Sequence, residues 1–252
     1  MVTNPLEGRV ALITGASRGL GRAMAVALAQ GGAKLALVAR DEEKLKETAA
    51  EVVAAGSEAR IFIADVAREA DVERLKHEVA HAYGHVDILI NNAGINHRKN
   101  LVDFTYEEWR RVMDTNVNSV FLMCRAFIPM MQGRGYGRII NMTSIMAHVS
   151  LPGRTVYSTT KTALLGLTRA LAQEVAPDGI TVVGISPGPF GTEMNIPIMN
   201  NPEMNAQFMS KIPLGRWGKV EEIGQLALFL CSDGAGFITG TDILIDGGWC
   251  AQ

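Results

Sequence analysis

The sequence Val10-Ala-Leu-Ile-Thr-Gly-Ala-Ser-Arg-Gly-Leu-Gly21 decides the fold, because it joins an apolar strand to a glycine-rich turn. A helical run from Arg22 to Gln30 follows the turn. Glycines at the start of a helix let the backbone approach a pyrophosphate, which the helix N-terminus favours. The spacing Gly-x-x-x-Gly-x-Gly differs from the commonest dinucleotide fingerprint, Gly-x-Gly-x-x-Gly, but the strand–turn–helix context predicts a dinucleotide site.

The rest of the chain repeats this alternation of apolar strands and helical patterns, which predicts a parallel sheet with helices on both faces. The expected strands are Val10–Thr14, Lys34–Ala39, Ala59–Ala64, Ile88–Asn91, Gly137–Ser144, Thr181–Ser186 and Ile243–Asp246. Right-handed crossovers would make this a doubly wound, Rossmann-like α/β sheet that binds ligands at the carboxyl ends of its strands. The motifs of the sequence fall at those ends, so we expect them to form one site.

Composition limits the possible classes of protein. The chain has 252 residues, which suits a single domain over 1–252, and its net charge of −2 gives no nucleic-acid signature. Without a leader pattern or an apolar run near the ~18 residues of a membrane span, we expect a cytoplasmic protein with no membrane partner. Cys124, Cys231 and Cys250 are far apart in apolar segments, so we expect core residues and no metal site.

Tyr157 and Lys161 lie four residues apart in an Ala/Leu-rich helical pattern that runs to about Val175, so both side chains project from one face. A free phenol has a pKa near ~10, and an adjacent ammonium favours the phenolate and lowers that pKa. Ser144 ends an expected strand, where its hydroxyl could face the same cleft. Tyr-x-x-x-Lys alone is common by chance, but together the three residues suit a carbonyl/alcohol reaction.

The motifs, in this order, resemble those of the classical short-chain dehydrogenase/reductase (SDR) family over nearly the whole chain. The matching motifs are Thr14-Gly15-x-x-x-Gly19-x-Gly21, Asn91-Asn92-Ala93-Gly94, Asn116, Ser144, Tyr157-x-x-x-Lys161 and Pro187-Gly188. The resemblance implies hydride transfer between a nicotinamide and a carbonyl carbon, in a homotetramer. It also implies four catalytic residues, namely Tyr157 as acid or base, Ser144 on the substrate oxygen, Lys161 tuning Tyr157, and Asn116 (with Asn118 as the neighbouring alternative) in a distorted helix that continues a proton relay.

The resemblance further implies the cofactor contacts. They are Gly15, Ser17, Arg18, Gly19, Leu20, Gly21, Arg40, Asp65, Val66, Asn92, Ala93, Gly94, Tyr157, Lys161, Pro187, Gly188, Phe190 and Thr192. Asp65 would take the adenine amino group, although a helix N-cap is an equal alternative, and Thr192 would take the nicotinamide carboxamide. Ala39 takes the place of the acid that binds the ribose 2′-hydroxyl in many NAD-binding folds, and Arg40 follows it. Arg18 in the glycine turn is a second candidate cation, so we expect NADP(H) to be preferred over NAD(H), although Asp41, one residue late, could take the place of that acid.

Two kinds of substrate fit the pattern. The stretches 92–109 and 246–252 resemble gluconate 5-dehydrogenases, and the cluster His97-Arg98-Lys99 could bind a carboxylate or phosphate or be a solvated loop. The overall pattern equally resembles 3-oxoacyl-carrier-protein reductases, which Arg134 supports and Asp178 opposes. A non-catalytic NADPH-binding scaffold is a third reading, which the intact catalytic motifs oppose. We expect a mobile lid over the substrate at about 190–212.

Overall fold

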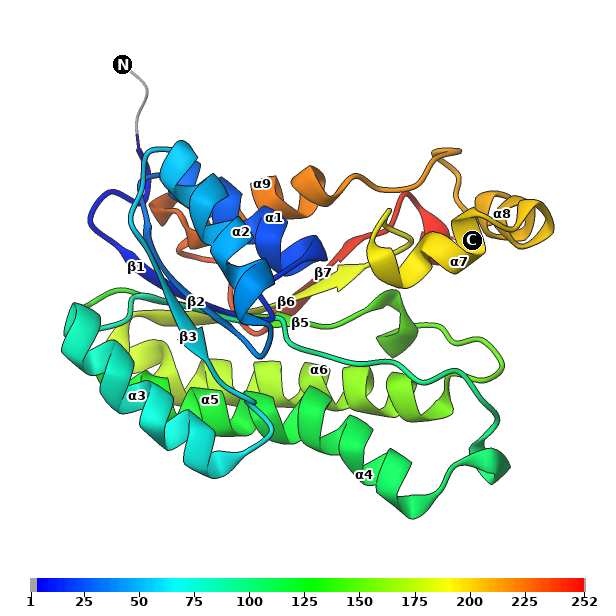
Figure 1. Cartoon of the computed structure of the whole chain (residues 1–252), viewed down its shortest axis with the longest axis horizontal. Helices are drawn as coiled ribbons and strands as arrows, with labels where there is room; N and C mark the ends of the chain where they lie inside the picture. Colours follow the sequence, from blue (N-terminus) through cyan, green and yellow to red (C-terminus); the bar gives the residue numbers. More distant parts are fainter. Residues whose placement is uncertain (1–3, 252) are drawn as a thin grey trace.

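A single sheet with helices on both faces organises residues 4–251, which are the residues that the computed structural model describes (Figure 1). Within this range the strands are β1 (Val10–Thr14), β2 (Lys34–Ala39), β3 (Ala59–Ile63), β4 (Ile88–Asn91), β5 (Gly137–Met142), β6 (Ile180–Pro187) and β7 (Thr241–Ile245). All of their pairings are parallel, in the order β3-β2-β1-β4-β5-β6-β7. The order reverses between β1 and β4, so the predicted doubly wound sheet is confirmed.

The helices form two layers. One face carries α1 (Gly19–Gln30), α2 (Glu42–Ala54) and α9 (Val220–Cys231), and the other carries α3 (Glu69–Tyr83), α4 (Tyr106–Met113), α5 (Ser119–Phe127) and α6 (Thr155–Val175) (Figure 1). Helices α1 and α9 approach closely, because a Cβ at Gly224 would lie only 2.8 Å from the Ala23 carbonyl oxygen. The short helices α7 (Ile196–Met199) and α8 (Pro202–Met209) lie beyond the carboxyl ends of the strands.

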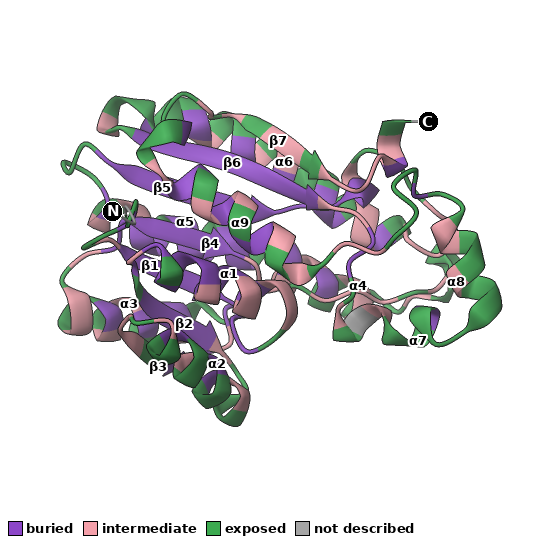
Figure 2. Cartoon of the chain, turned by 90° about the horizontal axis from the view of Figure 1, so that it is seen from above, coloured by how far each residue is buried: buried purple, intermediate pink, exposed green. Residues whose placement is uncertain are grey.

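The inner strands of the sheet are buried on both faces, as expected for parallel strands between two helix layers, whereas the edge strands β3 and β7 are partly exposed (Figure 2). Along β1, Ala11 and Ile13 belong to the apolar cluster under α1 and α9, whereas Leu12 belongs to the cluster under α3 and α5. Cys231 and Cys124 are buried in these same two clusters, which confirms their prediction as core residues, whereas Cys250 is only partly buried, against a smaller cluster near the C-terminus. The core is therefore divided into two halves, one between the sheet and each helix layer.

The helical segment that holds Asn116 is not one regular helix. α4 ends at Met113, a π-helical turn spans Asp114–Asn118, and α5 then continues to Phe127. The predicted strand ends also differ by a few residues, since β3 stops at Ile63 and β5 stops at Met142. These departures occur at the end of the sheet where the predicted site residues lie.

None of the helices within residues 4–251 combines the length and apolar character that crossing a bilayer requires. In the same range, no group of three or more His, Cys, Asp or Glu side chains is arranged to hold a metal ion.

Candidate active site

A pocket of about 950 Å³ opens at the carboxyl ends of the strands, where doubly wound sheets bind their ligands. It brings together most of the predicted site residues, namely Gly15, Ser17, Arg18, Gly19, Leu20, Arg40, Asp65, Val66, Asn92, Ala93, Gly94, Ser144, Tyr157, Lys161, Pro187, Gly188, Phe190 and Thr192. The other two predicted residues, Gly21 and Asn116, do not line the pocket.

The glycine turn is held by the strand beside it. Asn92 donates from Nδ2 to the carbonyl oxygens of Thr14 (2.9 Å) and Gly15 (3.0 Å). A Cβ at Gly21 would lie 2.5 Å from that amide nitrogen and closer still to the Gly15 oxygen. No side chain caps the N-terminus of α1, and no acid lies in its first turn, so its first N–H groups are left to an anion. The turn therefore suits a pyrophosphate.

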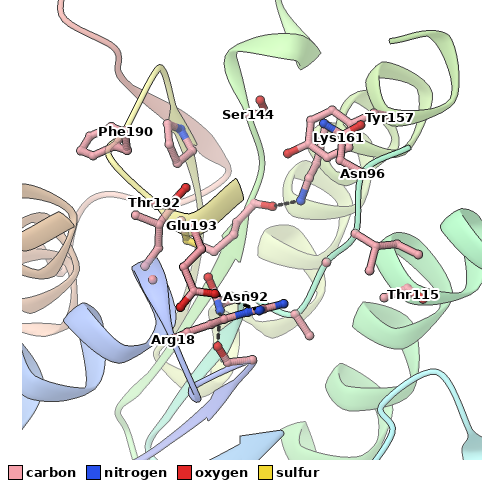
Figure 3. Close-up of a pocket in the computed structure, with 18 of the residues that line it drawn as sticks. Arg18, Asn92, Asn96, Thr115, Ser144, Tyr157, Lys161, Phe190, Thr192 and Glu193 are labelled. Atoms are coloured by element: carbon pink, nitrogen blue, oxygen red, sulfur yellow. Dashed lines mark hydrogen bonds and ion pairs between the residues drawn. The ribbon is translucent and has the colours of Figure 1, made fainter. Parts of the chain in front are cut away.

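Tyr157, Lys161 and Ser144 meet deeper in the pocket (Figure 3). Lys161 Nζ lies 5.6 Å from the centre of the Tyr157 ring and donates to the Met142 carbonyl oxygen at 2.5 Å. Ser144 caps the short helical turn after β5, where its Oγ accepts from Met146 N at 3.1 Å. One hydroxyl, one phenol and one ammonium thus converge from β5 and α6, which is a set able to hold an oxygen and move a proton to or from it.

The pKa of the phenol shifts in the direction opposite to the prediction. Burial raises the pKa of Tyr157, and a hydrogen bond with Ser144 and then the charges of Arg154 and Arg98 offset part of that rise. Burial also lowers the pKa of Lys161 to about 8. Lys161 contributes little to the phenol because its ammonium is turned toward the carbonyl oxygen of Met142.

We expect Lys161→Met to stabilise the protein at neutral pH when no cofactor is added. The folded pKa of about 8 lies below the ordinary 10.5, so the unfolded chain holds the proton more tightly and stability rises from pH 8 to pH 10.5. At ~1.4 kcal/mol per pKa unit, less about 1 kcal/mol for the lost hydrogen bond, the gain at pH 7 is about 2 kcal/mol. Urea unfolding across this range should show the advantage shrinking toward pH 10.5, and a constant difference would exclude burial of the charge as its cause.

Asn116 lies in the π-helical turn, which confirms the predicted distortion of the helix. Its Oδ1 accepts from Ile95 N (2.8 Å), and its Nδ2 donates to Ile95 O (2.9 Å) and to Thr160 Oγ1 (3.1 Å). The exposed Asn118 instead bonds to Asp114, so the two asparagines have different roles. The side chain of Asn116 fixes the backbone after β4, and a part in the proton relay stays a prediction for its main chain.

A protein-family model described as Enoyl-(Acyl carrier protein) reductase matches residues 15–250, which include the glycine turn and all of the converging side chains. The chain belongs to the short-chain dehydrogenase/reductase family. It is an oxidoreductase that acts on CH–OH and carbonyl groups.

Similar proteins carry different names. The gluconate 5-dehydrogenase of Gluconobacter oxydans is 37% identical over 96% of this chain and 95% of its own length. The 3-oxoacyl-[acyl-carrier-protein] reductase FabG of Haemophilus influenzae is 36% identical over 96% of this chain and 98% of its own length. The solved Pseudomonas aeruginosa RhlG/NADP active-site complex has a TM-score of 0.93 at 34% identity, with 99% of both chains covered. Nearly equal identities to differently named enzymes leave the substrate of this SDR open.

Acidic side chains hold the two cations predicted for the cofactor. Arg40 Nη1 lies 3.6 Å from Asp65 Oδ2, and Arg18 Nη1 lies 3.0 Å from Glu193 Oε2. The N-cap alternative for Asp65 is wrong, because α3 begins only at Glu69 and Asp65 Oδ1 instead accepts from Ala67 N in the preceding turn. An incoming phosphate would compete with these carboxylates for the two guanidinium groups.

At the wall of the pocket, a polar cluster that the sequence did not suggest connects β5, β6 and β7. Asp242 on β7 accepts from Thr143 Oγ1 (2.5 Å) and lies 2.8 Å from His148 Nε2. Thr143 Oγ1 also lies 2.8 Å from Ser186 Oγ on β6. Thr143 precedes Ser144, so the cluster fixes the strand end from which the Ser144 hydroxyl projects.

Proposed function

We propose that this SDR is an NADP(H)-dependent enzyme that interconverts a ketone and a secondary alcohol on a sugar acid or polyol. The nicotinamide supplies or takes up the hydride. In reduction Tyr157 donates a proton to the forming alkoxide, while Ser144 holds the same oxygen and offsets its growing charge. Lys161 holds the nicotinamide ribose hydroxyls, and Asn116 continues the proton relay. The convergence of Ser144, Tyr157 and Lys161 in the pocket that begins at the glycine turn is the observation that carries this proposal.

Other residues of the pocket wall would bind the adenine and the nicotinamide of the dinucleotide. Asp65 and Val66 would hold the adenine, and Thr192 would hold the carboxamide of the nicotinamide. Segment 190–212 would be the lid, since it supplies Phe208 and Asn195 to the outer wall of the pocket and is built of short helices. Together with the glycine turn, these residues would hold a cofactor along the strand ends.

The basic tip of β2 supports NADP(H). Ala39 stands where many NAD-binding folds carry the acid that binds the ribose 2′-hydroxyl, and Arg40 lines the pocket there. The carboxylate of Asp41, one residue later, accepts from Lys44 N as the N-cap of α2. We expect Arg40→Ala to raise the KM for NADPH by about 10- to 100-fold, since a hydrogen bond to a charged group contributes ~1.5–3 kcal/mol, and to leave the KM for NADH within about twofold. Steady-state kinetics with both cofactors measure this. Lys46→Ala, on the exposed face of α2, is the matched control, and equal losses with both cofactors would contradict a 2′-phosphate contact.

The acyl-carrier-protein alternative draws less support from the structure. Arg134 Nε lies 3.3 Å from the buried Asp87 Oδ1, and Asp178 accepts a hydrogen bond from Gln132 (3.0 Å). Neither position therefore offers a free basic group to an acidic carrier. The scaffold alternative is opposed by the intact set of Ser144, Tyr157 and Lys161.

A spectrophotometric screen tests the proposed reaction. NADP⁺ and NADPH, with NAD⁺ and NADH in parallel, are offered with sugar acids, polyols, β-keto thioesters and simple ketones. Turnover of gluconate-like acids without thioester activity supports the proposal, and the reverse supports the carrier-protein reductase. Absence of nicotinamide-linked turnover across the whole panel would support the scaffold.

We also propose a homotetramer, on the basis of exposed apolar groups. β7 pairs only with β6 in the described chain, and its Leu244 is 43% exposed. Phe121 on α5 is 51% exposed. An unpaired edge strand and an exposed aromatic side chain are features that assembly covers.

A further inference from the structure

Around the glycine turn the pocket carries both acidic and basic side chains, whereas near Tyr157 it carries only basic ones. Its acidic lining residues are Asp41, Asp65 and Glu193, all on the side of the glycine turn and the β2 and β3 tips. Arg98 and Arg154 line the other end, beyond Tyr157, where no acidic residue of the described chain lies on the wall. On the proposed function this second end holds the substrate, so the substrate meets positive charge.

The charge of Arg154 lies at the start of α6, on the wall of the pocket. Arg154 precedes α6 by one residue, yet its side chain does not cap the helix. Among residues 4–251, no hydrogen bond or ion pair holds its guanidinium, although the residue is half-buried. Burial lowers the pKa of Arg154, and the charge of Arg98 lowers it further. A desolvated cation that faces a like charge is unfavourable for the folded protein unless an anion binds there.

Arg98 and Arg154 lie close together because the residues next to them in the chain, Lys99 and Gly153, approach each other. A Cβ built on Gly153 would lie 3.7 Å from the backbone nitrogen of Lys99, so the two loops pack against each other. Arg98 also donates to Asn195 Oδ1 at 3.3 Å, at the start of the proposed lid. Lys99 instead bonds to Glu108 at 2.6 Å and does not line the pocket. Of the predicted cluster at 97–99, only Arg98 therefore faces the substrate end.

We propose that Arg154 and Arg98 form an anion subsite that binds an acidic group of the substrate, on the far side of Tyr157 from the cofactor. Two guanidinium groups offer several N–H donors in planar forks, which match the oxygens of a carboxylate or a phosphate. Leu151 and Phe208 line the same end, and such apolar neighbours strengthen the attraction by limiting water. The subsite rests on the proposed function and specifies its substrate class as an anionic hydroxy or keto compound.

Paired substrates test the subsite in the whole enzyme. We expect Arg154→Gln to lower kcat/KM for a sugar acid by about 10- to 100-fold, mainly through KM, and to change kcat/KM for the corresponding uncharged polyol by less than about threefold. Arg98→Gln should act in the same direction but more weakly, because Arg98 is more exposed. Arg169→Gln, on the exposed side of α6 and outside the pocket, is the matched control. Equal losses with charged and uncharged substrates would overturn the subsite.

Two further measurements separate the subsite from the reaction and from folding. Calorimetric titration of gluconate into the enzyme with NADP⁺ should show a Kd about tenfold or more higher in Arg154→Gln than in the wild type, and unchanged binding would overturn the subsite even if turnover fell. If no substrate of the panel turns over, the proposed function fails, but this titration still tests the subsite.

A series of sugar acids and sugar phosphates shows whether the bound anion is a carboxylate or a phosphate, because the class with the higher kcat/KM carries the group that the subsite binds. Arg154→Gln should melt no lower than the wild type, since it removes an unpaired charge.

Discussion

Tyr157→Phe should lower kcat by about 10³-fold while leaving the affinity for NADPH within about twofold. General acid–base catalysis typically contributes 10²–10⁴-fold, and phenylalanine keeps the ring but has no proton to donate. The ring should keep its place, because it packs against the apolar cluster of Ile145, Met146, Ile212 and Trp249, and Lys161 Nζ lies 5.6 Å from its centre. Steady-state kinetics in both directions and a fluorescence titration of NADPH measure the two quantities.

Tyr106→Phe is the matched control for this experiment. Tyr106 begins α4 and is 71% exposed, away from the pocket, so the same loss of a hydroxyl should leave kcat unchanged. Near-normal turnover in Tyr157→Phe would reject the phenol as the proton donor. The reaction would then need another acid, and Lys161, with a pKa lowered to about 8, is the group that the structure offers.

The fold could be predicted from the sequence because its strands carry an unusually simple signal. A parallel strand between two helix layers is apolar on both faces, so β1 appears as the continuous run Val10–Ile13, and β2 and β4 appear in the same way. The predicted positions of the strands therefore match the structure. Their ends near the pocket were less predictable, because Thr143 and Ser144 leave the strand to make side-chain hydrogen bonds.

Most of the candidate site could be predicted because its residues follow the strands directly or share one helical face. The roles of Arg154 and Asp242 could not be predicted, because each depends on contacts with residues far away in the chain. Arg154 lies near Arg98, and Asp242 contacts Thr143 and His148. The shift in the Tyr157 pKa was predicted with the wrong sign for a related reason. Sequence spacing placed Lys161 near the phenol, but burial and the direction of the ammonium depend on three-dimensional packing.

Gly21→Ala should raise the Kd for NADPH by at least about tenfold and lower the Tm by several degrees, although Gly21 does not line the pocket. A Cβ there would lie 2.5 Å from Asn92 Nδ2, which is held by hydrogen bonds to the oxygens of Thr14 and Gly15. The helix start and the turn must therefore move apart, at a typical cost of 1–3 kcal/mol for overpacking, and about 1 kcal/mol shifts Tm by ~2–4 °C in a chain of this size. Thermal melts and NADPH titration measure both effects.

Alanine substitutions at two other glycines distinguish the effect of steric crowding from the effect of backbone strain. Gly234→Ala should leave both quantities unchanged, because the nearest atom to its Cβ would be 3.5 Å away and the residue is exposed. Gly19→Ala has open space around its Cβ, with the nearest atom at 3.8 Å, but its φ of +54 is unfavourable for a side chain. If close packing of Gly21 against Asn92 positions the glycine turn, Gly21→Ala should weaken NADPH binding more than Gly19→Ala does. The reverse order would mean that the left-handed turn at Gly19, rather than the packing behind it, positions the N–H groups for the pyrophosphate.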